Sequence, residues 1–341
     1  MSLNKGKREG GRGKRNKTKN LFLPFLFFSS LLFPLTSFLV MGCGPKYTFP
    51  GDTVTKSIED ITRKENKMEV IARVEGRTLG ALYYVDDIVD EKGQVPKEVH
   101  EKMGQIMQAV SRVALSTDRP IDFCVVVIRD RAHLNELVVT RSLDDTRRAN
   151  SEALGVEESI NRTLFGQGKY QLAAGKENEF ELRDIKMGTF LADQISQRIR
   201  FDFLKDAKDD TTHTQSLVLV DGLYDTSSQD KRLRFSVLSL KPTEPRQTML
   251  NVFHIVNDVL GGYRFTDFKE IEVLDYLNRQ KLVIDREVLE DFQAKKITDQ
   301  LILNRYLTES QSVQEAFKLF GFNLSDSADN PDSPPLAPAT P

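Results

Sequence analysis

The sequence of 341 residues has no tryptophan, two cysteines and four histidines. The histidines lie at positions 100, 133, 213 and 254, too far apart for the short spacings from which most zinc sites are built. The GxSxG motif of α/β-hydrolases and the GxxxxGK[ST] motif of phosphate-binding loops are also missing. We therefore predict no metal ion and no cofactor, and the sequence identifies no catalytic residue.

Charge is divided unevenly along the chain. Eight of the 48 Lys and Arg residues, but one of the 50 Asp and Glu residues, precede Cys43, so the remainder of the chain has a net charge of -9. A surface with this acidic balance collects phosphate groups poorly, which argues against nucleic acid as a partner.

The basic N-terminal stretch is followed by an apolar segment, Leu21 to Val40, that contains no charged residue. It ends directly at Val40-Met41-Gly42-Cys43, which resembles the signal peptide and lipobox of bacterial lipoproteins, although Met41 is larger than the Ala or Ser more usual there. The resemblance implies a signal peptide over residues 1–42, cleavage before Cys43 and a palmitate-bearing lipid anchor on that cysteine. The folded part would then lie outside the cytoplasm, attached to a membrane of the cell envelope.

Two features of this segment bear on the kind of anchor and its location. About 20 apolar residues are enough to cross a bilayer, so an uncleaved transmembrane anchor is the alternative to lipidation. Both alternatives place the folded part outside the cytoplasm, because the basic flank stays inside. Gly44 follows the cysteine, where Asp would indicate retention in the inner membrane of the lipoprotein class, and this favours the periplasmic side of the outer membrane.

Cys124 is the second cysteine, and lipidation of Cys43 would leave it without a disulfide partner. It lies in the apolar run Ile121 to Ile128, which is typical of a buried strand. We predict a small core residue here instead of a reactive nucleophile.

The pattern of apolar residues predicts an α+β fold, in which mainly antiparallel sheets are covered by helices and form two packed lobes. β-rich runs precede a helix from Pro96, and Thr189 to about Lys205 forms a second helix. We expect a spacer over residues 43–66, lobes over 67–165 and 166–324, the second with a helical end, and a disordered Pro-rich tail over 325–341. A single mixed domain is the alternative, and no repeat of fixed period is visible.

These features favour a non-enzymatic binding or assembly factor that contacts another protein of the envelope. Two polar loops between β-rich runs are the candidate interaction sites, although solvated turns would look the same. The alternatives are a cell-wall or glycan hydrolase with unidentified acidic residues, or a small-molecule binding lipoprotein of a transporter with a cleft between the lobes. The loop residues are Asp86, Asp87, Asp90 and Glu91 in one, and Asp225, Asp230 and Lys231 in the other.

Overall fold

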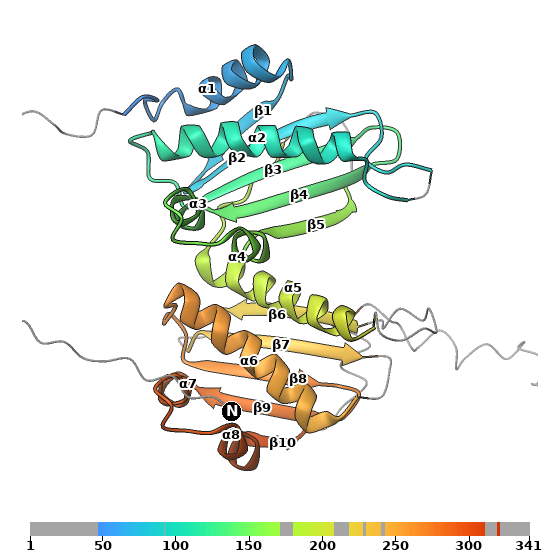
Figure 1. Cartoon of the computed structure of the whole chain (residues 1–341), viewed down its shortest axis with the longest axis vertical. Coiled ribbons are helices and arrows are strands. Elements are labelled where there is room, and N and C mark those ends of the chain that lie inside the picture. The colour runs from blue at the N-terminus through green and yellow to red at the C-terminus, as the bar shows by residue number, and fades with distance from the viewer. Residues whose placement is uncertain are drawn as a thin grey trace, which may run out of the picture. The chain divides into compact units, whose positions relative to one another are not determined.

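The computed structural model describes residues 47–91, 93–170, 180–207, 218–227, 230–239, 243–310 and 319–320. These residues confirm the α+β class, because they form two five-stranded sheets, mostly antiparallel, that pack against helices (Figure 1). The signal peptide, Cys43 and the Pro-rich tail lie outside the described residues. Within the described ranges, no helix combines the length and apolar character needed to cross a membrane.

The first lobe holds the sheet β1-β2-β3-β4-β5. β2 and β3 are parallel, with Leu79 opposite Cys124, and the other neighbouring strands are antiparallel. The long helix that connects β2 to β3 covers one face of the sheet (Figure 1). The elements are α1 (Val54–Ile61), a π-helical turn (Thr62–Asn66), β1 (Ile71–Glu75), β2 (Thr78–Val85), α2 (Lys97–Leu115), β3 (Phe123–Asp130), β4 (Asn135–Ser142), α3 (Leu143–Asn150), α4 (Val156–Asn161) and β5 (Leu164–Lys169).

The second lobe holds the sheet β10-β9-β8-β7-β6. β7 and β8 are parallel, with Phe235 opposite Val273, and the other neighbours are again antiparallel. Two long helices lie across one face of this sheet (Figure 1). The elements are α5 (Met187–Ala207), β6 (Val218–Asp225), β7 (Arg232–Ser239), α6 (Pro245–Tyr263), β8 (Glu270–Asp275), β9 (Gln280–Asp285), α7 (Arg286–Gln293), α8 (Asp299–Tyr306) and β10 (Leu307–Glu309).

The two lobes repeat one motif, with the element order α-β-β-α-β-β-α-α-β and a parallel pair at the same place in each sheet. Equivalent turns are closed by equivalent backbone bonds. The Tyr170 N–H donates to the Leu134 carbonyl at 2.9 Å, and the Ser310 N–H donates to the Arg279 carbonyl at 2.7 Å. Both acceptor residues have positive φ, 57° and 53°. The lobes are therefore a structural duplication.

The central helices of the two lobes also correspond. α2 and α6 are both 19 residues long, and each buries apolar side chains at the same successive spacings against its sheet. The matched residues are Met103, Ile106, Met107, Val110, Val113 and Ala114 in α2, and Met249, Val252, Phe253, Val256, Val259 and Leu260 in α6.

The predicted spacer differs from the structure over its second half. α1 and the π-helical turn occupy residues 54–66, and Val54 and Ile58 are buried in the core of the first lobe. The Glu59 carboxylate accepts a hydrogen bond from the Ala72 N–H of edge strand β1 at 3.2 Å. The prediction failed because this helix is only eight residues long and carries few apolar residues among many polar ones.

The predicted lobe boundary and helical end also need correction. The boundary at 165/166 falls inside β5, which pairs with β4 and belongs to the first sheet. The segment after α6 holds three strands as well as helices. In β8 the carboxylates at positions 270 and 272 hide the alternation of Ile271 and Val273, and cross-strand cations pair with both of these acids.

Buried polar contacts connect the lobes. Arg162, which ends α4, donates to Asp145 of α3 at 3.1 Å and to Glu158 at 2.7 Å. From the second lobe, the Tyr263 hydroxyl donates to Asp145, and the Gln194 amide donates to the Arg162 carbonyl at 2.8 Å. Asp145 is 1% exposed. Because buried charges are costly without partners, this network makes the contact between the lobes specific.

Candidate functional site

The loop with Asp86, Asp87, Asp90 and Glu91 follows β2, and its side chains lie toward solvent. Asp87 pairs with the Nδ1 atom of His133 at 3.2 Å, and the carboxylate of Asp90 accepts a backbone hydrogen bond within its own turn. The loop is a turn fixed to the first lobe, and its role in recognition stays a prediction.

The hairpin tip with Asp225, Asp230 and Lys231 joins β6 to β7, and residues 228–229 of it are not described. Lys231 donates to Asp267 at 2.6 Å, and Lys269 donates to Asp230 at 2.7 Å. This tip precedes β7, whereas the acidic loop of the first lobe follows β2, the counterpart of β7. The two predicted loops therefore occupy opposite ends of the repeated motif, one in each lobe.

Among the described residues, no group of three or more His, Cys, Asp or Glu side chains could hold a metal ion. Cys124 is fully buried in β3, as predicted, and burial raises the pKa of its thiol to about 12. At neutral pH the thiol is therefore protonated, so the prediction of a core residue is confirmed.

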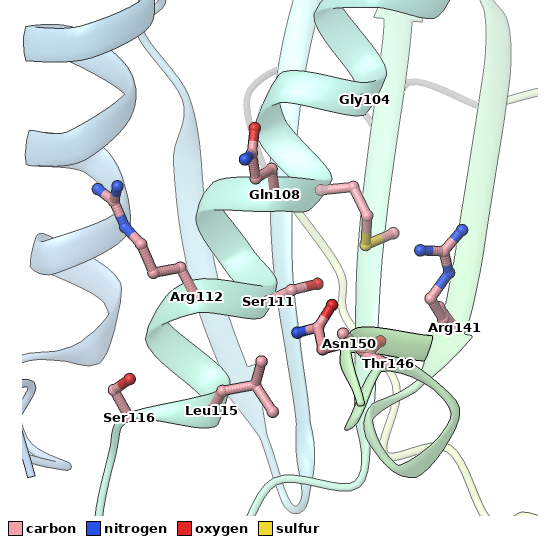
Figure 2. Close-up of a pocket in the computed structure, with 10 residues that line it drawn as sticks. Gly104, Gln108, Ser111, Arg112, Leu115, Ser116, Arg141, Thr146 and Asn150 are labelled. Atoms are coloured by element: carbon pink, nitrogen blue, oxygen red, sulfur yellow. The ribbon is translucent and has the colours of Figure 1, made fainter. Parts of the chain in front are cut away.

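A cavity of about 460 Å³ opens in the first lobe between α2, α3 and the end of β4 (Figure 2). The lining contains no carboxylate and combines cationic, neutral polar and apolar side chains. Figure 2 shows Arg141 of β4 and the α3 residues Thr146 and Asn150 on one side of the cavity, across from α2. The lining residues are Gly104, Met107, Gln108, Ser111, Arg112, Leu115, Ser116, Arg141, Thr146 and Asn150.

Arg141 provides the half-buried charge of this cavity. It lies opposite Cys124 in the β3–β4 pairing, so it projects from the sheet face that α2 covers. Its Nε donates to the Thr163 hydroxyl at 3.2 Å. Burial lowers the pKa of Arg141, but an arginine remains charged at any pH where the protein is folded.

The other cation of the lining stands at the end of α2 nearer to solvent. Arg112 is exposed and is already paired with Glu65 at 2.6 Å. Ser111 is buried and contacts the thiol of Cys124. The interior of the cavity therefore has one cation, Arg141, among the neutral groups of the described lining.

The second lobe shows what the same position looks like when it belongs to a core. The Cys124–Arg141 cross-strand pair corresponds to Ile271–Ile284, because both are the second pair of their hairpin counted from the residue before α3 or α7. Ile271 and Ile284 are 1% exposed and belong to the core of the second lobe. The cation thus replaces a core aliphatic residue of the repeated motif.

At neighbouring positions, too, the first lobe has a smaller or more polar side chain than the second lobe. Thr146 of α3 corresponds to the buried Leu289 of α7, and Met107 of α2 corresponds to Phe253 of α6. Phe253 contacts Phe292 with ring centroids 4.8 Å apart, which fills the space beneath α7. The cavity exists because smaller or polar side chains occupy these positions in the first lobe.

Sequence reasoning missed Arg141, although a signal was present. Leu137, Val139 and Arg141 alternate along β4, so all three project toward α2. A cation at a core-facing position of an alternating strand is unusual and marks a site that a search for catalytic motifs does not detect.

A smaller cavity, about 280 Å³, lies where the lobes meet, between β4, β5, α5 and β6. Gly222 of β6 allows β6 to pack closely against α5, since a Cβ at this position would lie 2.2 Å from the Ser196 hydroxyl oxygen. Its lining includes Asp193, Asp221 and Arg200, so its charges are mixed. It is the described feature that most resembles the predicted cleft between lobes, but it is smaller than the α2–α3 cavity.

No family model and no curated protein matches the chain. Among solved structures, the crystal structure of a sex pheromone staph-cAM373 precursor is 8% identical, with coverage of 68% of this chain and 78% of that one and a TM-score of 0.19. A sex pheromone precursor from Lactobacillus salivarius subsp. salivarius UCC118 is 12% identical, with coverage of 60% and 58% and a TM-score of 0.18. Scores this low assign neither fold nor function to this chain.

Proposed function

We propose that this chain is a lipid-anchored protein of the bacterial cell envelope whose folded part is a non-catalytic binding module. The observation that carries the binding role is the α2–α3 cavity, where the first lobe departs from the packed core of its duplicate. Concave sites with mostly apolar walls and a few placed polar groups are the usual form of ligand pockets.

Sequence features support the anchor. The apolar segment ends directly at Gly42-Cys43, and Gly44 favours the periplasmic side of the outer membrane. The compact unit begins at Tyr47, so only a short stretch separates Cys43 from the first folded residues. The folded part would therefore be held close to the membrane surface, within reach of envelope proteins and lipid headgroups.

The anchor is tested by feeding cells a labelled fatty acid and isolating the protein. We expect label on the wild type and on Cys124→Ala, and none on Cys43→Ala, because Cys43 is the residue that the lipobox presents for acylation. Cys124→Ala is the matched control, since it removes the other cysteine of the chain. Equal labelling of Cys43→Ala and the wild type would contradict the lipoprotein assignment.

The non-catalytic role is tested with the purified chain from Tyr47 onward. We expect no release of soluble products from cell-wall or glycan substrates, and recovery of a crosslinked partner or ligand from the envelope. Release of such products at a rate proportional to protein concentration would instead establish the hydrolase alternative.

A further inference from the structure

We propose that the α2–α3 cavity binds a small molecule or headgroup through an anionic group, carboxylate or phosphate, that pairs with the guanidinium of Arg141. This inference rests on the proposed function as a binding module and names the chemistry of its ligand. It follows from the charge of the cavity, from the contacts of Arg141 and from the internal comparison between the lobes.

The contacts of Arg141 leave most of its donors available. Its Nε donates to Thr163, and among the described residues it forms no ion pair. Asp145, the buried acid that acts on Arg141 electrostatically, already accepts hydrogen bonds from Arg162 and Tyr263. A half-buried guanidinium presents a planar fork of donors that matches carboxylate and phosphate oxygens, so an anionic ligand would supply the missing partner.

The lining favours an anion over a cation or an acidic partner surface. None of its ten residues is Asp or Glu, although the chain beyond the lipobox carries a net negative charge. Asn150 and Gln108 place neutral amide donors around the opening. A cation in a lining without carboxylates attracts anions to this site, whereas the net negative charge of the chain beyond the lipobox repels them elsewhere.

Comparison with the second lobe indicates that the fold does not require an arginine at position 141. The equivalent position of the second lobe is Ile284, which is 1% exposed, so an aliphatic residue is compatible with the same fold. Replacing a well-packed aliphatic residue by a desolvated cation costs stability unless another interaction compensates. An ion pair between Arg141 and a bound anion would offset this loss of stability. The offset would exist only while the ligand is bound.

The size of the cavity indicates more than a free inorganic ion. About 460 Å³ lies within the range of small-molecule pockets, and Met107 and Leu115 provide apolar walls beside the cation. A ligand with an anionic head and a short apolar part fits this lining. Both a soluble metabolite and the headgroup of an anionic lipid have this chemistry, and the anchor would bring the second within reach.

The test is calorimetric titration of the chain from Tyr47 onward with sodium phosphate and with sodium acetate at constant ionic strength. We expect binding to the wild type that is weakened about tenfold or more in Arg141→Ile, which introduces the residue of the second lobe. Thr146→Leu, which introduces the side chain found at Leu289, should weaken binding by filling the cavity without removing charge. Arg119→Gln, which removes an exposed cation of the same lobe, is the matched control and should bind like the wild type.

A second arm identifies the source of the anion through cosedimentation with phosphatidylglycerol vesicles. Sedimentation that is lost in Arg141→Ile, together with weak binding of free phosphate, assigns the site to a lipid headgroup, whereas phosphate or acetate binding without sedimentation assigns it to a soluble ligand. No binding of any probe by the folded wild type, or binding by Arg141→Ile and Thr146→Leu equal to that of the wild type, would overturn the inference. Such a result leaves the fatty-acid labelling unaffected, so failure here is distinguishable from failure of the lipoprotein assignment.

Discussion

The two lobes share their order of elements, their sheet topology and the length of their central helix, yet they differ in what lies between that helix and the next short one. In the second lobe this space holds Phe253, Ile284 and Leu289 and is part of the core. In the first lobe Arg141 and Thr146 take the places of Ile284 and Leu289, and a cavity results. The comparison teaches that a few side-chain differences can leave a cavity where the same backbone plan otherwise holds a packed layer.

The opposite faces of the sheets differ too. The first sheet is covered on this side by Phe180 and Leu182, and Gly80 permits the contact because a Cβ there would lie 2.8 Å from the Leu182 side chain. The second sheet carries Glu272 on this side, hydrogen-bonded to Arg234 at 2.7 Å and paired with a lysine of β9. The second face of the first sheet is therefore covered by apolar side chains, whereas that of the second sheet combines these charge pairs with a smaller apolar cluster around Leu238 and Tyr276.

The largest expected effect concerns α1, which belongs to the core of the first lobe. A chain beginning at Lys67 lacks α1, and we expect it to lose cooperative unfolding of the first lobe, whereas a chain beginning at Tyr47 unfolds cooperatively.

The substitution Ile58→Ala should cost about 2–5 kcal/mol in the free energy of unfolding, because Ile58 is fully buried. Lys56→Ala, on the exposed side of the same helix, is the control in urea denaturation. Equal midpoints for the two substitutions would contradict the placement of α1.

The next effect concerns the buried polar network that connects the two lobes. Asp145→Asn removes the charge that Arg162 and Tyr263 share, and we expect a loss of about 3 kcal/mol, because the buried Arg162 then keeps only Glu158 as an ionic partner among the described residues. Asp144→Asn, an exposed neighbour on α3, should leave stability unchanged within about 0.5 kcal/mol. Chemical denaturation followed by both tyrosine fluorescence and circular dichroism measures the change. Equal free energies of unfolding for the two variants would show that the contact between the lobes does not depend on this network.

The smallest effect depends on pH and is specific to the second lobe. Burial alone would raise the pKa of Glu272, but hydrogen bonds from Lys281 and Arg234 outweigh burial and hold the pKa below its ordinary value. The charged form therefore stabilises the fold above the unfolded-state pKa, about 4.3, and this contribution disappears as pH falls through the lower folded-state pKa. We expect Glu272→Gln to cost about 1 kcal/mol at pH 7 and the difference from wild type to vanish in acid.

The matched control for that experiment is Glu101→Gln, which breaks the exposed pair with Lys97. Exposed pairs contribute little, so we expect a change below about 0.5 kcal/mol at any pH. Thermal unfolding from about pH 3 to pH 7 measures both variants across the range in which the carboxyl titrates. If the loss of stability in Glu272→Gln stayed constant with pH, the contacts of Glu272 would stabilise the lobe through packing and not through charge.

Part of the fold could be predicted because its apolar spacing is regular. The helix around Met103 and the strand around Cys124 both match the structure, since their apolar residues recur with the period of the element. β8 was missed because Glu270 and Glu272 interrupt its apolar run, and only the cross-strand cations of the folded sheet explain them. Charge pairs between strands are tertiary information that a single run of residues does not contain.

The duplication was missed for a different reason. Equivalent residues are not separated by a constant number of positions along the sequence. The separation is larger between Arg77 and Lys231, which directly precede β2 and β7, than between Tyr170 and Ser310, which directly follow β5 and β10. A search for a fixed period cannot detect such a repeat. The candidate site depended partly on this repeat: the alternation along β4 indicates that Arg141 faces the core, and its counterpart Ile284 shows which side chain a packed core has at that position.

The central claim is that the first lobe binds an anionic group where the second lobe is packed, and the most direct measurement is a map of amide chemical shifts during phosphate titration of the ¹⁵N-labelled chain from Tyr47 onward. The account predicts saturable shifts at Ser111, Arg141 and Thr146, and none at the counterparts Ile284 and Leu289. Shifts that follow exposed basic residues in both lobes without saturation, or the same response in Arg141→Ile, would contradict it.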